Sequence, residues 1–378
     1  MKVLSKLDLS GKKILLRVDL NSKVFNGKVI ESDRIKAHSK TIKFLVKKKA
    51  KVVIIAHQGS PGKSYFISLK QHAKILNKYL GNSVKFVNST IGRKAKQEIS
   101  KLKPGKVILL ENTRFLKDEF TPSIKNKFVK TFLDLGFDYY VNDAFSVSHR
   151  NHTSIASFPK VFPHAIGFVM EEELKNVKKL KSKLKNCLFI LGGKKSEDLI
   201  PLLKNKRVLT GGQFSLLTLM ANGYKLGKED KLMKKNKHLI SKIKKYSKNL
   251  KNPIDLAINF KGKRKVLNLK DFPQNYLVLD IGDKTIDLYK KEIKKAKAIF
   301  FKGALGMFED KKFEKGTKEI LKAISKSKAF SVLAGGQTSD ALKKFHIGKK
   351  KFDYVSLSGG ALVRYLAGEK LVGLEVLK

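Results

Sequence analysis

Arginine is scarce in this chain, and half of its copies lie in short polar motifs. Of the 82 lysines and arginines only eight are arginine, so lysine carries most of the net charge of +50. A guanidinium group presents a planar pair of donors that matches a carboxylate or phosphate held in fixed geometry. We therefore expect the motif arginines to recognise anions, with a structural ion pair as the alternative at any one position. They are Arg17, Arg34, Arg114 and Arg150.

Polar motifs follow several apolar, strand-like segments in the first half of the chain. In open α/β sheets the carboxyl ends of the strands form the ligand crevice, so these motifs would gather around one small polyanion. A zinc site from His149 and His152 is an alternative, but neither has a carboxylate or cysteine partner at metal-ligand spacing. The motifs are Arg17 to Asn21, His57 to Gly59, Glu111 to Phe115 and Tyr140 to His152, with Arg34 nearby.

Strand-like segments in the second half end in glycine. Glycine lets the backbone approach a phosphate, and a following helix presents N–H groups and the positive end of its dipole. A single glycine pair would be an ordinary turn, whereas repetition at strand ends predicts a nucleotide crevice. The P-loop and the GxGxxG motif are both absent from the sequence. The glycines are 192 and 193, 211 and 212, 303, 335 and 336, and 359 and 360.

An anion-binding half and a nucleotide-binding half together indicate phosphoryl transfer. The reaction needs no protein nucleophile, because the protein aligns two anions and neutralises charge on the transferring group. We expect domain closure to bring the two ligands into line.

The composition is that of a globular protein with two domains. The chain has 378 residues, with 42% hydrophobic and 30% charged, and is long enough for two cores. Its apolar runs are too short for a membrane helix, and Asp8, Lys12 and Lys13 interrupt the N-terminal segment where a secretory signal would be apolar. A lone cysteine, Cys187, excludes an internal disulfide and a cysteine zinc site. We therefore expect a cytoplasmic protein without membrane partners.

The positive charge by itself suggests nucleic-acid binding, but its distribution favours a solvated surface. The lysines are spread along the chain in short runs, such as Lys47 to Lys49, instead of forming one basic tail. The aromatic stacking motif of RNA-binding sheets is absent, as is tryptophan. We expect no specific nucleic-acid partner, while weak, salt-sensitive binding to RNA stays an alternative.

Alternating strand and helix patterns predict an α/β fold with parallel sheets. Ser32 and Asp33 are expected to begin a helix with Ile35 and Ile42 on its apolar face, followed by a strand over 52–56. A second helix carries an apolar stripe, with acidic residues at its start and lysines toward its end, as the helix dipole favours. That stripe is Met170, Leu174, Val177 and Leu180.

The ordered motifs resemble those of phosphoglycerate kinases over essentially the whole chain. The resemblance implies two Rossmann-like parallel-sheet domains joined by a hinge helix. In this family the C-terminal segment returns to the first domain. We therefore expect a first, glycerate-phosphate-binding domain at 1–168 with 361–378, a connecting helix at 169–183, and a nucleotide-binding domain at 184–360. The missing C-terminal insertions and the variant at 56–59 are closer to archaeal members. Matching segments are 17–21 (RVDFN in the family), 57–61 (HLGRP), 111–115 (ENVRF), 140–152 (YVNDAFGTAHRAH), 192–200 (GGAKVSDKI), 280–282 (DIG), 302–309 (NGPMGVFE), 335–338 (GGGDT) and 356–361 (STGGGA).

This resemblance implies reversible transfer of the acyl phosphate of 1,3-bisphosphoglycerate to MgADP, giving 3-phosphoglycerate and MgATP. Arg34 and Lys195 would act on the transferring group, and the enzyme would be a monomer. The implied glycerate ligands are Asp19, Asn21, Arg34, His57, Arg114 and Arg150. The implied nucleotide ligands are Gly192, Gly193, Lys195, Gly212, Gly303, Glu309, Gly335, Gly336, Gln337 and Thr338.

Four positions depart from the family pattern in charge or in donor type. Ser60 replaces an arginine, Leu199 a lysine, Lys302 an asparagine, and Gln337 a magnesium-binding aspartate. Lys194 and Lys302 are candidates to restore positive charge, and Asp198 is a candidate to approach the metal, whose ligands stay unassigned. Two interpretations remain open here, an active enzyme with altered metal coordination and a degenerate member with weak or no catalysis. A basic RNA-associated protein on the same scaffold is a third.

Overall fold

The computed structural model describes residues 1–193 and 195–378, which form two compact units. The first unit comprises Met1–Lys175 and Lys370–Lys378, and the second comprises Asn176–Glu369. The boundary falls inside helix α6 (Phe168–Lys181). The segment that returns to the first unit therefore starts at Lys370, while α13 (Gly360–Leu366) groups with the second unit, beyond the expected limit at residue 360.

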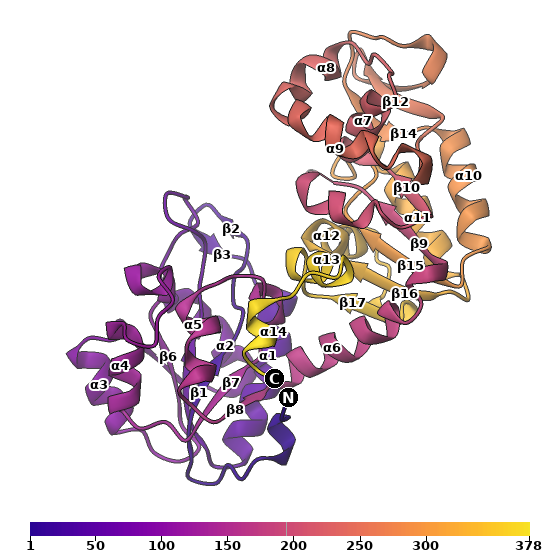
Figure 1. Ribbon diagram of the computed structural model, residues 1–378. Coiled ribbons are helices and arrows are strands. Elements are labelled where there is room, and N and C mark those ends of the chain that lie inside the picture. The colour runs from indigo at the N-terminus through magenta and orange to yellow at the C-terminus, as the bar shows by residue number, and fades with distance from the viewer. Residues whose placement is uncertain (194) are drawn as a thin grey trace. The chain divides into compact units, whose positions relative to one another are not determined.

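A six-stranded parallel sheet forms the centre of the first unit (Figure 1). Its order is β5-β6-β4-β1-β7-β8, so successive strands are added first on one side of β1 and later on the other. The strands are β1 (Lys13–Arg17), β4 (Lys51–Ile55), β5 (Val84–Val87), β6 (Val107–Leu110), β7 (Tyr139–Asn142) and β8 (His164–Ile166), with a small hairpin of β2 (Val24–Phe25) and β3 (Lys28–Val29).

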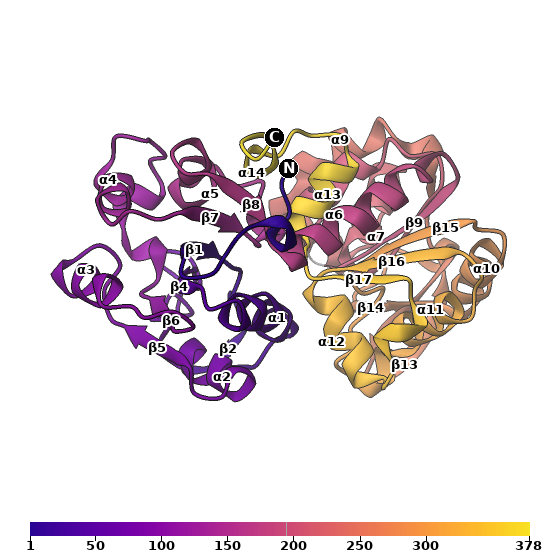
Figure 2. The same cartoon turned by 90° about the horizontal axis from the view of Figure 1, so that it is seen from below.

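Alternating side chains cover both faces of this sheet. Ile14 and Leu16 pack with Val52 and Ile54 in a core shared with α1 and α2. On the other face, Tyr140 contacts Phe158, and the aromatic cluster continues into α4. Figure 2 shows α1 and α2 on one side of the sheet and α4 and α5 on the other. The helices are α1 (Asp33–Lys47), α2 (Lys70–Leu80), α3 (Arg93–Ser100), α4 (Lys127–Asp134), α5 (Thr153–Ala156) and α14 (Val372–Glu375).

The second unit contains a parallel sheet of the same type, in the order β11-β10-β9-β15-β16-β17. The predicted α/β class with two parallel sheets is confirmed. The order again reverses beside the first strand of the unit, between β9 and β15. The strands are β9 (Cys187–Leu191), β10 (Val208–Thr210), β11 (Leu250–Lys251), β15 (Ala298–Lys302), β16 (Phe330–Ala334) and β17 (Tyr354–Ser356).

Helices also cover both faces of the second sheet. Ile190 and Phe301 pack against α10, α11 and α12, while Phe189 and Phe300, which alternate with them, contact each other on the opposite face. Figure 2 shows α10 to α12 on one side and α7 and α13 on the other. The helices are α7 (Gly212–Ala221), α8 (Lys228–Leu232), α9 (Ile240–Lys244), α10 (Asp283–Lys294), α11 (Lys315–Ser325) and α12 (Gly336–Lys344).

One element of the second unit has no counterpart in the sequence prediction. The strands β12 (Asp255–Phe260), β13 (Lys263–Asn268) and β14 (Val278–Ile281) form a three-stranded antiparallel sheet in the order β13-β12-β14. Its turn at Lys261 and Gly262 is tight, with positive φ at both residues, and the Phe260 and Tyr276 rings make an edge-to-face contact outside the main core. The strand-then-helix alternation used for the prediction does not apply to such a hairpin.

The helix predicted after Ser32 begins where expected, but not through the expected cap. Ser32 is the N-cap residue of α1, yet its side chain makes no capping hydrogen bond. Its Oγ lies 2.9 Å from the Ser22 Oγ instead. The second predicted helix is also present as α6, and all four residues of its apolar stripe are buried. None of the helices in residues 1–193 and 195–378 is long and apolar enough to cross a bilayer.

A fully buried carboxylate joins three elements of the first unit. Asp143, directly after β7, accepts hydrogen bonds at Oδ2 from His38 Nδ1 and Thr41 Oγ1 of α1, both at 2.8 Å. Its Oδ1 accepts from the Val169 and Met170 amides, at 2.8 and 3.2 Å, and so satisfies free donors at the start of α6. Gly167 is required beside it, because a Cβ there would lie 2.4 Å from Oδ1.

Replacing Asp143 with alanine is expected to destabilise the first unit strongly. The Asp143→Ala variant would leave four buried donors without an acceptor, a loss of roughly 3 kcal/mol or more. For a domain of this size the calorimetric melting temperature should fall by roughly 6–12 °C. Asp134→Ala, at the exposed end of α4, is the control and should change little. Equal shifts for the two variants would contradict the role of Asp143.

Candidate active site

The carboxyl ends of the central strands of the first unit carry the predicted anion-binding residues. β1 pairs with β4 and with β7, so the residues that follow these three strands lie on one edge of the sheet. Because the strand order reverses there, this edge is the position at which open α/β sheets bind ligands. Contacts or charge interactions connect all six predicted residues, which are Asp19, Asn21, Arg34, His57, Arg114 and Arg150.

Asp19 is the buried acceptor of this edge. Its Oδ2 lies 3.3 Å from the Arg34 Nε and accepts from Ser146 Oγ, and its Oδ1 accepts from the Asn21 amide at 2.9 Å. Burial by itself would raise the pKa of the Asp19 carboxyl, but the Arg34 charge and these hydrogen bonds outweigh burial and hold the pKa well below its ordinary value. Asp19 is therefore ionised and fixes the direction of the Arg34 side chain.

Arg114 and Asn21 are both held by the loop that follows β4. The Asn21 Oδ1 accepts from the Gly59 amide at 2.9 Å, and Arg114 Nη1 donates to the Gly59 carbonyl and, at 3.0 Å, to Ser60 Oγ. Ser60, where the family pattern has an arginine, thus positions another arginine. The Arg114 Nε is buried and has no hydrogen-bond partner among the described residues. Buried donors of this kind call for an acceptor such as a bound anion.

Arg17 is enclosed behind this site and forms no ion pair with a carboxylate of the described residues. Its Nε donates to Ser154 Oγ at 3.0 Å, and Ser154 in turn donates to Glu119 Oε1 at 2.7 Å. Its Nη2 lies 3.1 Å from the His57 Nδ1. Burial raises the pKa of the Glu119 carboxyl, an effect that the Arg17 charge and the Ser154 hydrogen bonds oppose. Arg17 therefore supports the site through neutral neighbours.

The site carries an excess of positive charge. Burial, together with the Arg17 and Arg150 charges, lowers the pKa of Arg114 to about 10. Burial and the Arg17 charge also lower the pKa of His57 well below its ordinary value, so the imidazole is neutral. Since a guanidinium group can only donate, the His57 Nδ1 accepts the Arg17 hydrogen bond and its ring proton is on Nε2. An anion would relieve this repulsion.

His38 and Ser146 are support residues that the sequence analysis missed. The His38 Nε2 accepts from the Asp19 amide at 3.2 Å, so its ring proton lies on Nδ1 and is donated to Asp143. One signal was available, because Arg34, His38 and Thr41 have the i, i+4, i+7 spacing of one helix face. Ser146 had no such pattern.

The glycine-rich strand ends of the second unit pack closely on one another. The amides of Gly192, Gly193 and Gly212 donate to the carbonyls of Lys302, Ala304 and Leu305, each at 2.8 Å. Gly303 has a φ of +98°, and a Cβ there would lie 2.1 Å from the Gly192 carbonyl oxygen. These glycines therefore shape the crevice, and their amides are already bonded.

The backbone after β16 differs from these three strand ends. Gly335 is the N-cap of α12, and the space around Gly336 is open. The Thr338 Oγ1 accepts from the Gly303 amide at 3.1 Å and donates to the Ala334 carbonyl at 2.8 Å, which ties α12 to β15 and β16. The positive end of the α12 dipole thus lies at the carboxyl edge of the sheet.

A cavity of about 370 Å³ opens beside these strand ends. Its lining combines apolar side chains with five polar or charged ones, a mixture that suits a small-molecule site. Asp280 is one of them; burial raises the pKa of its carboxyl to about 7, opposed by hydrogen bonds from the Gly316 and Ile281 amides. Four predicted nucleotide ligands line the cavity: Gly193, Gly212, Glu309 and Gln337. The other lining residues are Gln213, Ser215, Leu256, Val278, Leu279, Asp280, Ala304, Leu305, Gly306 and Met307.

Three of the positions that depart from the family pattern, Leu199, Lys302 and Gln337, lie in the second unit and differ in burial and in their neighbours. Leu199 is fully buried, whereas Lys195 is exposed. The Gln337 Oε1 lies 2.5 Å from the point that a Cβ on Gly193 would occupy, so the amide reaches the crevice. Lys302 is 8% exposed at the end of β15. Lys194, the other candidate for restoring charge, lies outside the described residues.

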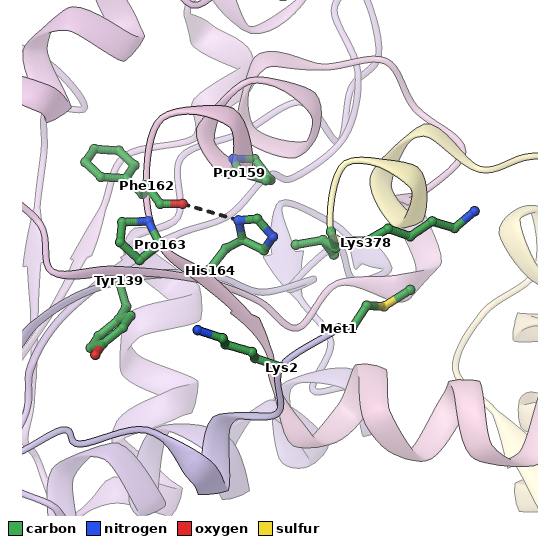
Figure 3. Close-up of a pocket in the computed structure, with 9 residues that line it drawn as sticks. Met1, Lys2, Tyr139, Pro159, Phe162, Pro163, His164 and Lys378 are labelled. Atoms are coloured by element: carbon green, nitrogen blue, oxygen red, sulfur yellow. Dashed lines mark hydrogen bonds between the residues drawn. The ribbon is translucent and has the colours of Figure 1, made fainter.

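A second cavity, of about 470 Å³, lies in the first unit at the amino ends of β7 and β8 (Figure 3). Tyr139 and His164 begin these strands, so the cavity is on the opposite edge of the sheet from the arginine cluster. The His164 Nδ1 lies 3.2 Å from the Phe162 carbonyl oxygen, and most of the wall is formed by Pro159, Pro163 and the two chain ends. Its lining offers no charge cluster comparable to the arginine site.

A metal held by protein side chains alone is not found in the described part of the chain. No three histidine, cysteine, aspartate or glutamate side chains lie close enough together there to hold an ion. His152, considered above for zinc, is 3.7 Å from Glu119, and burial with the Arg114, Arg17 and Arg150 charges lowers its pKa to about 3.

Comparisons with known proteins all find phosphoglycerate kinases, and the matches cover nearly the whole length of this chain. The family profile "Phosphoglycerate kinase" matches residues 4–369. The phosphoglycerate kinase of Sulfurisphaera tokodaii is 40% identical, covering 99% of this chain and 95% of the relative, and that of Methanothermus fervidus is 38% identical, covering 98% and 95%. The crystal structure of phosphoglycerate kinase from Pyrococcus horikoshii has a TM-score of 0.92 and 34% identity, covering 100% of this chain and 98% of that chain.

The neutral state of His57 can be measured by NMR. Because burial and neighbouring arginines lower its pKa, the ring should stay neutral, with its proton on Nε2, from pH 8 down to well below its ordinary value of about 6.5. The His57 signal, identified by its loss in His57→Gln, should not shift between pH 8 and 6. A midpoint at or above 6.5 would contradict the charge arrangement of the site.

Proposed function

This chain belongs to the phosphoglycerate kinase family, and on that basis we propose direct, reversible transfer of the acyl phosphate of 1,3-bisphosphoglycerate to ADP. The bond between the carboxyl oxygen and phosphorus breaks as a β-phosphate oxygen of ADP binds the same phosphorus in line. The products are 3-phosphoglycerate and ATP. The chain is a phosphotransferase that acts on small molecules, and the degenerate and RNA-associated alternatives are not favoured.

The arginine cluster of the first unit is the observation that carries this proposal. We assign the phosphoglycerate to it, with Asp19 and Asn21 as acceptors for the hydroxyl group and for Arg34. The buried, unpartnered Nε of Arg114 and the mutual repulsion among Arg17, Arg114 and Arg150 would be relieved by a polyanion. Neutral His57 would then donate from Nε2. In this assignment Arg34, fixed by Asp19, reaches the transferring phosphoryl group.

We assign the nucleotide to the second unit. The 370 Å³ cavity would hold the adenosine, with Met307 and Leu256 against the base and the exposed Glu309 at the ribose. Gly193, Gly212 and Gly303 would shape the crevice, while Gly335, Gly336 and Thr338 would present the start of α12 to the phosphates. Lys195 would contact the phosphate chain from the exposed side.

The side-chain oxygens near the strand ends fit a magnesium ion that binds together with the nucleotide. Mg²⁺ usually keeps several waters and takes one or two protein carboxylates together with substrate phosphates. Asp198 is the carboxylate whose charge acts on Lys302 at the strand ends, and the Gln337 amide oxygen is a neutral donor beside Gly193. We propose that Asp198 is the protein ligand of this ion, which would neutralise phosphate charge.

We further propose a cytoplasmic monomer that uses domain closure to bring the ligands together. The lone Cys187 is buried, and burial raises the pKa of its thiol to about 12, which suits a reducing compartment without disulfides. Light scattering after size-exclusion chromatography would test the monomeric state.

Turnover with defined substrates tests the function. Purified protein with 1,3-bisphosphoglycerate and MgADP should form ATP, and a chelator in excess of Mg²⁺ should stop the reaction. No turnover above a heat-killed control would overturn the enzyme function, and turnover unaffected by the chelator would overturn the magnesium assignment alone.

Replacement of Arg34 should affect turnover more than nucleotide binding. An interaction that strengthens in the transition state contributes mainly to kcat. We expect Arg34→Ala to lower kcat by about 10²- to 10³-fold, with the KM for ADP changed less than about threefold. Arg93→Ala, at the exposed start of α3, is the matched control and should behave as the natural protein. Equal losses in kcat and in ADP affinity would argue against the proposed role.

A further inference from the structure

Glu119 is a fully buried carboxylate behind the arginine cluster of the first unit. It ends the short helical turn Lys117–Glu119, which follows the Arg114 motif in the chain. Its Oε1 accepts hydrogen bonds from Ser154 Oγ at 2.7 Å and from Thr113 Oγ1 at 3.3 Å, and its Oε2 accepts from the Ser154 amide at 2.9 Å. Because both oxygens accept from donors, the carboxyl group is ionised.

The negative charge of Glu119 acts on two arginines of the site. Ser154 connects Glu119 to Arg17, since its Oγ accepts from the Arg17 Nε at 3.0 Å and donates to the carboxylate. Burial raises the pKa of Glu119, and the Arg17 charge is the strongest influence that opposes this effect. Burial lowers the pKa of Arg114, and Glu119 opposes this effect more strongly than Asp19 does. The buried carboxylate therefore offsets positive charge at both arginines.

Two further titratable side chains beside Glu119 are neutral. The His152 Nδ1 lies 3.7 Å from the Glu119 Oε1, but burial and the neighbouring arginine charges lower the pKa of His152 to about 3. Burial raises the pKa of the Tyr140 hydroxyl, and the Glu119 charge adds to this effect. Both side chains are uncharged at neutral pH, so they neither add to the charge of Glu119 nor cancel it.

Capping of α5 is the simplest alternative explanation of Glu119. The carboxylate accepts from the Ser154 amide near the start of α5, where a helix leaves donors free. A neutral side chain such as asparagine or serine caps a helix as well, and it costs far less to bury than a carboxylate. Asn126 does this for α4, because its Oδ1 accepts from the Val129 amide at 2.9 Å. Capping alone therefore does not require a charge at this position.

We propose that Glu119 is an internal counter-charge that weakens the binding of the polyanion by the arginine cluster. The proposal rests on the assignment of phosphoglycerate to the first unit. By offsetting part of the Arg17 and Arg114 charge in a buried region, where charges act strongly, the carboxylate limits the affinity for 3-phosphoglycerate. The product can then leave after each turnover. Glu119 contacts no ligand in this role and acts only through the arginines.

A Glu119→Gln variant tests the proposal, because the amide keeps the size of the side chain and removes its charge. Calorimetry should measure the dissociation constants of 3-phosphoglycerate and of ADP. We expect 3-phosphoglycerate to bind about three- to tenfold more tightly, while the ADP affinity, set in the second unit, changes less than about twofold. The KM for 3-phosphoglycerate should fall in proportion, and kcat should not rise. Glu98→Gln removes the same charge from a surface pair with Lys85 on α3; it is the matched control and should bind as the natural protein does.

The direction of the change separates a counter-charge from a structural role. Unchanged or weaker binding of 3-phosphoglycerate by a folded Glu119→Gln variant would overturn the proposal, because the loss of a helix cap loosens α5 and does not tighten the site. An equal gain in Glu98→Gln would show a general effect of net charge and would also overturn it. Failure of the natural protein to bind 3-phosphoglycerate would contradict the assignment of that ligand, and the proposal with it. If Glu119→Gln does not fold, Glu119→Asn, which leaves room for a water, provides the same comparison.

Discussion

Both units depend on a constraint of parallel sheet topology. A parallel sheet whose strand order reverses beside its first strand leaves a gap between the helices that follow the two central strands. In the first unit this point lies between β1 and β7, and in the second between β9 and β15. The polar residues of each unit gather at that point because every central strand ends on the same edge.

The two units form their candidate sites from different groups at the point where the strand order reverses. In the first, a chain of side-chain hydrogen bonds runs from Asp143 through His38 to the Asp19 amide, and Asp19 holds Arg34. The cations of the site are thus oriented before any anion binds. In the second, glycines allow strand ends to approach one another, and Lys302 remains as a buried cation between them. One site is built by side chains and the other mainly by backbone.

The sequence predicted the fold correctly, and the structure brings the predicted anion-binding residues together at one edge of the first sheet. The helix from Asp33, the helix from Phe168 and the glycine-terminated strands occur where their patterns placed them. It did not predict the antiparallel sheet formed by β12 to β14, or the support that His38 and Ser146 provide to Asp19. Periodicity and motifs report local preferences, whereas these features depend on contacts between distant segments.

The residue types and their order by themselves determined which groups are available: a few arginines in polar motifs, repeated glycines at strand ends, and a lysine at 302. Only the tertiary structure decided what each group does. It enclosed Arg17 behind the site, hydrogen-bonded the Gly192 and Gly212 amides to backbone carbonyls, and left the Arg114 Nε without a hydrogen-bond partner among the described residues. The reason is physical, because burial and hydrogen-bond partners are properties of the folded chain and set the charge and direction of each group.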